Sequence, residues 1–139
     1  MKVKEISTIR EFIDAIRIRV EVFVNEQGFK PGWEPDEDDK KARQFIILKG
    51  KKVIGTLRAR KSGKGFKIER MAISKDGRQG GAGRMLLAGA VKALKRSHPR
   101  RIWMQSQVQA RRFYEKCGFK VVSSSYDLYG VPHVDMELR

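Results

Sequence analysis

Apolar side chains recur at helical spacing near the start of the chain, which predicts an amphipathic helix. The stripe is formed by Phe12, Ile13, Ile16, Val20 and Phe23. Thr8 precedes it and Glu11 follows three residues later, which is the spacing of a capping box. The segment KVKEI before it predicts a short strand. We expect the helix to end before Gly28, because residues 28–41 hold two prolines, two glycines and an acidic run.

The next segments show the pattern of a three-stranded meander. RQFIILKG (43–50) and KKVIGTLRAR (51–60) meet at a Gly-Lys turn, which predicts a hairpin, and FKIERMAIS (66–74) follows a second turn at SGKG (62–65). Strict alternation along this third strand predicts which side chains lie on each of its two faces. One face would carry Lys67, Glu69, Met71 and Ile73, and the other Phe66, Ile68, Arg70 and Ala72.

The second half of the chain alternates helix and strand. A stripe formed by Leu87, Ala90, Val91 and Leu94 predicts a helix that stops before Pro99. RIWMQSQV (101–108) predicts a strand and QARRFYEKC (109–117) a short helix. FKVVSSS (119–125) and VPHVDMELR (131–139) predict two closing strands joined by a YDLYG turn. The strand–helix–strand unit implies a parallel strand pair, so we expect a mixed α/β domain.

Composition narrows the class of protein. A length of 139 residues without repeats or linkers fits one domain, 1–139. No run of eighteen apolar residues predicts a membrane span, and the N-terminus lacks the apolar core of a secretory signal. One cysteine, Cys117, allows no internal disulfide, which suits a cytoplasmic setting. With only His98 and His133 available, clustered Cys/His zinc sites are excluded, and we expect no metal.

The formal net charge is +15, from 31 Lys and Arg against 16 Asp and Glu. This excess attracts anionic ligands and permits weak, salt-sensitive binding to nucleic acid, although a solvated basic surface would explain most of it equally well. The segment EPDEDD (34–39) holds five of the acidic residues. It could meet a polyamine or a lysine-rich peptide, solvate its loop, or offset the basic surface.

A glycine-rich segment lies between the third strand and the following helix. Gly80, Gly81 and Gly83 are flanked by Arg78 and Arg84. Glycine lets backbone amides approach a ligand closely, and the amides at a helix start form an anion site that phosphate commonly occupies. The spacing fits neither a Walker A loop nor a dinucleotide-binding fingerprint. A plain strand-to-helix turn is the alternative, but it needs no flanking arginines.

The pattern Arg78-x-x-Gly81-x-Gly83 before a helix resembles motif A of the GNAT superfamily, the Gcn5-related N-acetyltransferases. QVQARRFYEKCGF resembles the second signature of that family, with Gln107 where asparagine is usual and with matching Ala110, Phe113 and Tyr114. The segments VFVNEQGF, EPDEDD and YGVPHVDMEL are similar to the ElaA-like branch. The resemblance covers nearly the whole chain.

This resemblance implies a single-domain GNAT fold: a mixed, mostly antiparallel sheet with a splayed parallel pair, flanked by about four helices. It also implies transfer of an acetyl group from the cosubstrate acetyl-CoA to a primary amine by direct attack. The splay between FKIERMAIS and RIWMQSQV would admit the pantetheine arm as an added strand. The implied cofactor-binding residues are Met71, Ala72, Ile73, Arg78, Gln79, Gly80, Gly81, Ala82, Gly83, Arg84, Gln107 and Phe113.

Within this resemblance Tyr114 is the expected general acid, protonating the thiolate of CoA as it leaves. Outside the motif it would be an ordinary packed aromatic residue. Glu69 is the expected base, or a relay through water, against the alternative of a surface glutamate paired with a cross-strand lysine. Glu26 is a second candidate for the base. His133 could assist, although a lone histidine in a strand is more often structural.

Two other functions stay open at this point. One is a basic nucleic-acid-binding module that uses the glycine loop as a phosphate clamp, although no groove-reading motif and no interleaved aromatic platform is present. The other is a GNAT protein that binds acyl-CoA without turnover. The identity of the amine acceptor is not readable, and the sequence leaves a homodimer open.

Overall fold

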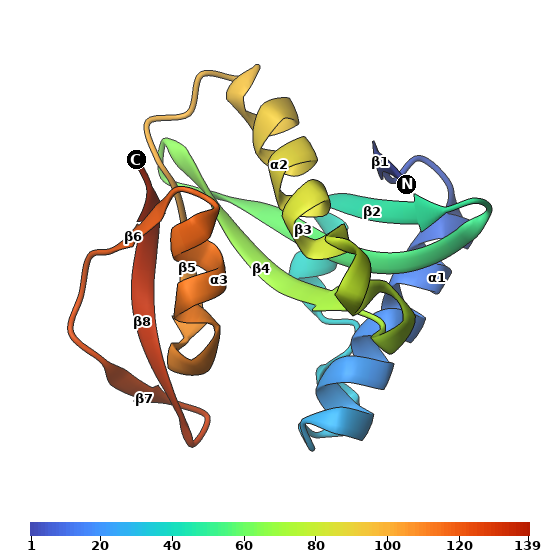
Figure 1. Cartoon of the computed structure of the whole chain (residues 1–139), viewed down its shortest axis with the longest axis horizontal. Coiled ribbons are helices and arrows are strands. Elements are labelled where there is room, and N and C mark those ends of the chain that lie inside the picture. Colours follow the sequence, from blue (N-terminus) through green and yellow to red (C-terminus); the bar gives the residue numbers. More distant parts are fainter.

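The computed structural model describes residues 1–139 (Figure 1). The first half contains β1 (Lys2–Glu5), α1 (Ile9–Arg19), a π-helical segment (Val20–Glu26), two 3₁₀ turns (Pro31–Trp33 and Glu37–Lys40), β2 (Arg43–Lys49), β3 (Lys52–Ser62) and β4 (Gly65–Ile73). The second half contains a 3₁₀ segment (Lys75–Gly80), α2 (Ala82–Lys95), β5 (Ile102–Gln107), a 3₁₀ turn (Val108–Ala110), α3 (Arg111–Lys116), β6 (Phe119–Val121), β7 (Tyr126–Leu128) and β8 (Val131–Leu138).

One sheet runs through the molecule in the order β1-β2-β3-β4-β5-β8-β6, and β7 pairs with β8. All neighbours are antiparallel except β4 and β5. This parallel pair is joined only from Phe66–Ile102 to Ile68–Met104, while β4 continues to Ile73 without a β5 partner. The predicted mixed sheet with a splayed parallel pair is therefore confirmed, and Figure 1 shows the two halves of the sheet diverging below this junction.

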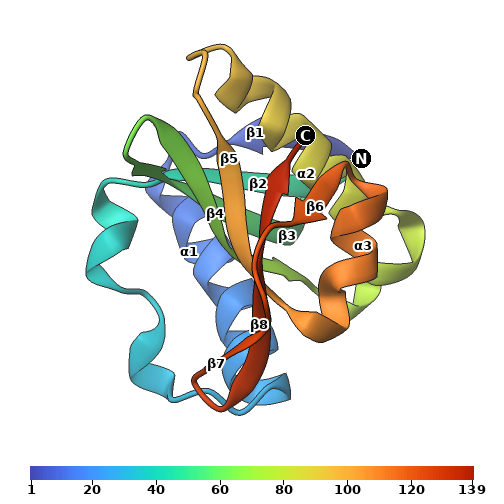
Figure 2. The same cartoon turned by 90° about the vertical axis from the view of Figure 1, so that its left-hand side faces the viewer.

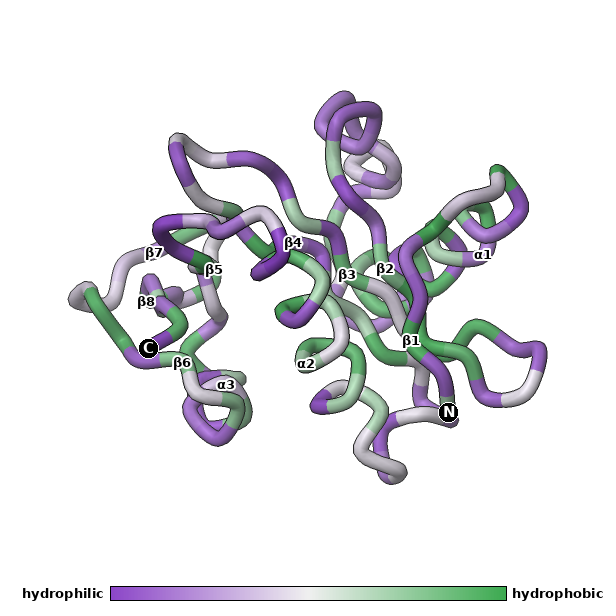
Figure 3. Tube along the Cα trace, turned by 90° about the horizontal axis from the view of Figure 1, so that it is seen from above, coloured by the Kyte–Doolittle hydropathy of each residue, from purple (hydrophilic) through white to green (hydrophobic).

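Helices cover both faces of the sheet. α2 and α3 lie on one face and α1 on the other (Figure 2). The main core of 17 buried residues joins α2 to the strands, and Leu86, Leu87 and Leu94 are each at most 1% exposed. Burying such a side chain contributes about 1.5–3 kcal/mol. In Figure 3 hydrophobic segments concentrate in the central strands, and the connecting loops are mostly hydrophilic.

The start of α1 confirms the predicted capping box. The Thr8 hydroxyl accepts from the Glu11 amide at 3.2 Å, and the Glu11 carboxylate accepts from the Thr8 amide at 3.2 Å. The helix then continues as a π-helix to Glu26, so the expected boundary before Gly28 holds. The sequence pattern did not indicate the change from α- to π-helical bonding at Val20.

The predicted alternation along β4 is wrong in its second half. The register between β3 and β4 shifts between Thr56 and Arg58, and Arg70 has a φ of 52°. This bulge inserts one residue into β4 and reverses the faces beyond it. Phe66 and Ile68 face the main core before the bulge, and Met71 and Ile73 pack against that same core after it. Ala72 instead packs with Ile18 and Val22 of the α1 side.

The expected YDLYG turn is also only partly correct. Tyr126–Leu128 forms the strand β7, which pairs with β8 from Tyr126–His133 to Leu128–Val131. The reversal itself occurs at Tyr129 and Gly130, which have φ values of 56° and 79°. A three-residue strand leaves little periodicity to detect, because only one full alternation fits within it.

No helix of the structure combines the length and apolarity needed to cross a membrane. No group of three or more His, Cys, Asp or Glu side chains is arranged to hold a metal ion. The single cysteine, Cys117, is half-buried, and burial raises the pKa of its thiol. A raised pKa keeps the thiol protonated at neutral pH, and Cys117 packs against the main core.

Candidate active site

A cavity of about 370 Å³ opens where β4 and β5 separate. Its wall brings together the π-helical segment, the loop after it, β3, β4, β5, α3 and the β7–β8 hairpin. Both predicted catalytic residues, Tyr114 and Glu69, line this cavity, together with Met71 and Gln107 of the predicted cofactor-binding set. Residues far apart in the sequence, from Phe23 to His133, therefore meet at the point where the sheet is open.

The glycine segment forms the start of α2 beside this opening. Gly81 is the N-cap residue with a φ of 75°, and no side chain caps the helix. A Cβ added at Gly81 would meet no atom within 4 Å, so the backbone there is accessible from outside. The first amides of α2 lack helical partners and carry partial positive charge. The arrangement has the properties of an anion-binding site.

Gly83 serves a different purpose from Gly81. A Cβ at this position would lie 3.1 Å from Cζ of Phe113, so the absence of a side chain lets α3 approach the first turn of α2. The Phe113 and Tyr114 rings contact each other edge to face, with centroids 5.1 Å apart. Phe113 and Gly83 thus belong to one packing contact that fixes α3, and with it Tyr114, against the start of α2.

The two flanking arginines differ in their contacts. Arg78 donates through Nε to the Ile73 carbonyl at 3.0 Å and through a terminal nitrogen to Glu26 at 2.6 Å. Arg84 is exposed and donates to the Lys116 carbonyl at 3.5 Å. Arg78 therefore fixes the loop to the end of β4, and Glu26, the second candidate for the base, is its ion-pair partner.

The other predicted cofactor-binding residues lie around the same opening. Gln79 and Gly80 are exposed in the 3₁₀ segment, whereas Ala82 is fully buried in the core. Met71, Ala72 and Ile73 form the end of β4 that has no β5 partner. Gln107 ends β5, where it donates to Gln27 at 3.2 Å. Their binding roles stay predictions.

Tyr114 occupies the floor of the cavity from α3. Its hydroxyl lies 3.7 Å from the sulfur of Met71, on the unpaired part of β4. Burial raises the pKa of Tyr114 to about 12. The phenol therefore keeps its proton at neutral pH. The thioether of Met71 is a weak hydrogen-bond acceptor, so a stronger acceptor can take its place. Tyr114 is therefore protonated and lies beside the unpaired part of β4, and its role as the acid stays a prediction.

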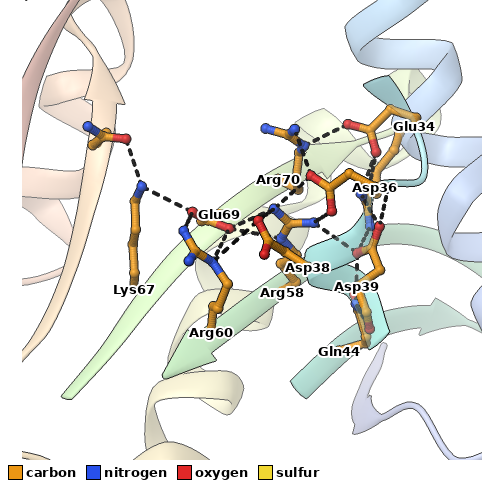
Figure 4. Close-up of polar contacts among 12 residues, drawn as sticks. Glu34, Asp36, Asp38, Asp39, Gln44, Arg58, Arg60, Lys67, Glu69 and Arg70 are labelled. Carbon is orange, nitrogen blue, oxygen red and sulfur yellow. Dashed lines mark hydrogen bonds and ion pairs between the residues drawn. The ribbon is translucent and has the colours of Figure 1, made fainter. Parts of the chain in front are cut away.

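Glu69 lies on the opposite wall within a cluster of cations (Figure 4). Its carboxylate accepts from Arg58 at 2.7 Å and from Arg60 at 2.7 Å, and it lies 3.0 Å from the ammonium of Lys67. Burial by itself raises the pKa of Glu69, but the bonds from Arg60, Arg58 and Lys67 outweigh it and lower the pKa to about 2. At neutral pH Glu69 is ionised, with three cations competing for its lone pairs.

The acidic segment 34–39 is part of the same network. The carboxylates of Glu34, Asp36 and Asp39 bind the guanidinium groups of Arg19, Arg58 and Arg70. Arg19 and Arg58 are at most 2% exposed, so these pairs are removed from water. Several roles were left open for segment 34–39, and the structure supports the neutralisation of basic residues. The main partners are the buried arginines Arg19 and Arg58, not basic side chains of the surface.

We expect Arg58→Met to lower the free energy of unfolding by about 3–5 kcal/mol, because removal of one partner leaves several buried carboxylates uncompensated. Arg60→Met is the matched control: Arg60 also binds Glu69, but its side chain is 35% exposed, so we expect a loss of about 1 kcal/mol or less. Urea unfolding followed by circular dichroism measures both. Equal, small losses would show that the network does not stabilise the fold.

Sequence reasoning missed the outer part of the cavity. Trp33 from the loop after the π-helical segment meets Tyr129 from the β7–β8 turn, with ring centroids 4.7 Å apart, and Phe29 stacks on Trp33 at 5.2 Å. These contacts join the two halves of the splayed sheet across the cavity. Aromatic residues within loops carry no periodic signal, so only the fold could show that they meet.

Comparisons with known proteins agree with this architecture. The model of the acetyltransferase (GNAT) domain matches residues 13–139. The uncharacterized protein YyaT of Bacillus subtilis is 32% identical over 139 residues, which cover 98% of this chain and 94% of YyaT.

Solved structures show the same fold at lower identity. Escherichia coli ElaA has a TM-score of 0.88 at 21% identity, with all of both chains covered. An aminoglycoside 6'-N-acetyltransferase complexed with coenzyme A has a TM-score of 0.81 at 12% identity, covering 99% of this chain and 96% of that one. Because the domain model spans nearly the whole sequence, the chain belongs to the GNAT acetyltransferase family.

Proposed function

We propose that this chain transfers an acetyl group from acetyl-CoA to a primary amine by direct attack, with both substrates bound together. The observation that carries the proposal is the Tyr114 hydroxyl at Met71, on the stretch of β4 that has no β5 partner. A proton donor and an unpaired strand edge meet at one cavity, and the same strand leads through the 3₁₀ segment to the anion-binding start of α2. Holding two reactants in such a site can supply several kcal/mol of the barrier reduction.

Acetyl-CoA fits the residues present. The uncapped start of α2, with open space at Gly81, would hold the diphosphate through the amides of residues 78–84. The free edge at Met71, Ala72 and Ile73 would pair with the pantetheine arm. The aminoglycoside acetyltransferase with the same fold is itself complexed with coenzyme A, which supports this choice. We propose a cytoplasmic setting, in keeping with a single, unpaired cysteine.

Tyr114 acts as the general acid in this proposal. The amine attacks the acetyl carbonyl carbon, the carbon–sulfur bond breaks, and the departing thiolate takes the phenolic proton. A pKa of about 12 keeps the phenol protonated at neutral pH until the thiolate forms. In the proposed step the phenol recovers its proton afterwards from the nitrogen of the new amide. Met71 lies beside this hydroxyl, so the reacting sulfur would replace a weak thioether contact.

We propose that Glu69 acts as a relay that orients water through its ionised carboxylate, and that it does not itself carry the proton. Glu69→Gln should then lower kcat about tenfold and leave the shape of the pH–rate profile between pH 5 and 9 unchanged, because its pKa of about 2 lies far below that range. Initial rates with the folded variant test this. Loss of the acidic limb of the profile would instead identify Glu69 as the base.

The decisive experiment measures release of the CoA thiol from acetyl-CoA with a panel of amines: tyramine, spermidine, free lysine and a lysine-containing peptide. We expect turnover with at least one of them. Binding of acetyl-CoA by calorimetry without thiol release would favour the non-catalytic acyl-CoA-binding alternative. Tight binding of a short DNA duplex at physiological salt, with no binding of acetyl-CoA, would favour the nucleic-acid-binding module.

A further inference from the structure

His133 lies on the cavity side of β8. Along this strand Val134 and Met136 enter the main core, so the side chains of His133 and Asp135 point to the opposite face. His133 pairs in register with Gln107, the last residue of β5, and lines the same cavity as Tyr114 and Glu69. The imidazole ring of His133 therefore lies beside the last residue of β5, the strand that borders the opening.

The tautomer of His133 is set by the backbone. Its Nδ1 lies 2.8 Å from the Val131 carbonyl, which can only accept, so Nδ1 carries the proton and Nε2 carries the lone pair. The Tyr126 ring stacks on the imidazole with centroids 6.3 Å apart and an angle of 25°. Together the two contacts fix both the plane and the protonation pattern of the ring. Nε2 makes no hydrogen bond within the chain.

No other side chain of the cavity lining offers an imidazole nitrogen with a lone pair. Each carboxylate of the wall lies within 4.0 Å of an arginine. Asp135 accepts the Tyr126 hydroxyl at 2.5 Å and the Ser123 hydroxyl accepts from the Asp135 amide, so the Asp135 carboxylate already has a partner. The titratable and charged groups that face the cavity from the surrounding elements are Glu34, Asp36, Asp38, Arg58, Arg60, Lys67, Glu69, Arg70, Tyr114 and Tyr129.

We propose that His133 Nε2 is the general base that removes the proton of the acceptor ammonium, an inference that rests on the acetyltransferase function proposed above. The ammonium gives one proton to Nε2 and becomes a neutral amine, whose lone pair forms the new bond to the acetyl carbon. The carbon–sulfur bond breaks, and Tyr114 protonates the thiolate. The second proton of the nitrogen restores the Tyr114 phenol, and His133 releases the first one to solvent, so one proton leaves per turnover.

His133→Asn tests the assignment, because its side-chain amide keeps a donor for the Val131 carbonyl and lacks a basic atom. We expect kcat/KM at pH 7, for the amine of the panel that the wild type uses fastest, to fall about 10²-fold. The loss should shrink as pH rises, since the free amine then forms without a base. Added imidazole should partly restore the rate of His133→Ala. His98→Asn, the same change at the exposed second histidine, should keep the wild-type rate and profile.

Several outcomes would overturn the assignment. A His133→Asn rate within about threefold of the wild type, with an unchanged acidic limb of the pH–rate profile, would show that His133 does not contribute as a general base is expected to. If the variants do not fold, nitrogen chemical shifts of the wild-type ring decide: a proton on Nε2 in the neutral form excludes the proposed acceptor. No thiol release by the wild type with any amine would remove the proposed function itself, which is distinguishable from an active enzyme that does not need His133.

Discussion

Tyr114→Phe is expected to lower kcat by about 10²- to 10³-fold, the usual contribution of a positioned acid. The substitution removes only the hydroxyl that lies 3.7 Å from the Met71 sulfur, and it keeps the ring packed against Phe113 and Phe119. The leaving thiolate would then have to take its proton from water. Affinity for acetyl-CoA, measured by calorimetry, should stay nearly constant, because the hydroxyl is used only after the thioester bond weakens.

Tyr129→Phe removes the same atom from the rim of the same cavity, where the side chain is exposed, and we expect less than about a threefold change in kcat. The comparison separates a chemical role from a general effect of a tyrosine hydroxyl on the cavity. Rates are taken across pH 5 to 9 for both variants. An unaltered Tyr114→Phe rate over this range would remove Tyr114 from the acid role while leaving the family assignment intact.

Gly81→Glu should weaken the binding of acetyl-CoA by at least about 100-fold, which corresponds to about 2.8 kcal/mol. Two effects combine. A φ of 75° disfavours any residue with a Cβ by about 1 kcal/mol or more. The new carboxylate also stands at the start of α2, where it would occupy the amides and repel the diphosphate of the coenzyme. Calorimetry with acetyl-CoA measures the loss.

Gly63→Glu provides the matched control. Gly63 also has a positive φ, of 59°, and open space around its Cβ position, but it lies in the turn between β3 and β4. It therefore carries the same strain and charge change without touching the proposed site. Gly81→Ala separates strain from charge and should lose less affinity than Gly81→Glu. Equal affinities of Gly81→Glu and Gly63→Glu would contradict the assignment of the diphosphate to the start of α2.

Much of the fold was readable because its signals are local. Thr8 and Glu11 mark the start of α1 within one turn, and Gly50 with Lys51 marks the hairpin between β2 and β3. The bulge at Arg70 was not readable, because a positive φ at an arginine contradicts its local preference. That φ persists where the guanidinium is bound to Glu34 and Asp36, contacts more than thirty residues away in the chain.

Some features of the candidate site were likewise readable from the sequence, and others were not. The glycine segment and the segment around Tyr114 were recognised from short motifs, and their proximity followed from the resemblance. Glu69 was predicted from its strand, yet its low pKa depends on Arg58 and Arg60, which come from the neighbouring strand β3. His133 was named only as a residue that could assist, since no pattern in the sequence shows that Val131 fixes its tautomer or that its ring reaches the cavity.

The amino-acid sequence by itself determined the family, the order of helices and strands, and a glycine-rich helix start at Gly81. These features depend on backbone preferences and apolar periodicity, which act over a few residues. Only the tertiary structure decided which charges neutralise one another around Arg58, which ring nitrogen of His133 is bound to the backbone, and that the Tyr114 hydroxyl lies beside Met71. Such properties depend on distance and on the exclusion of water, and both are set by residues that the chain brings together from far apart.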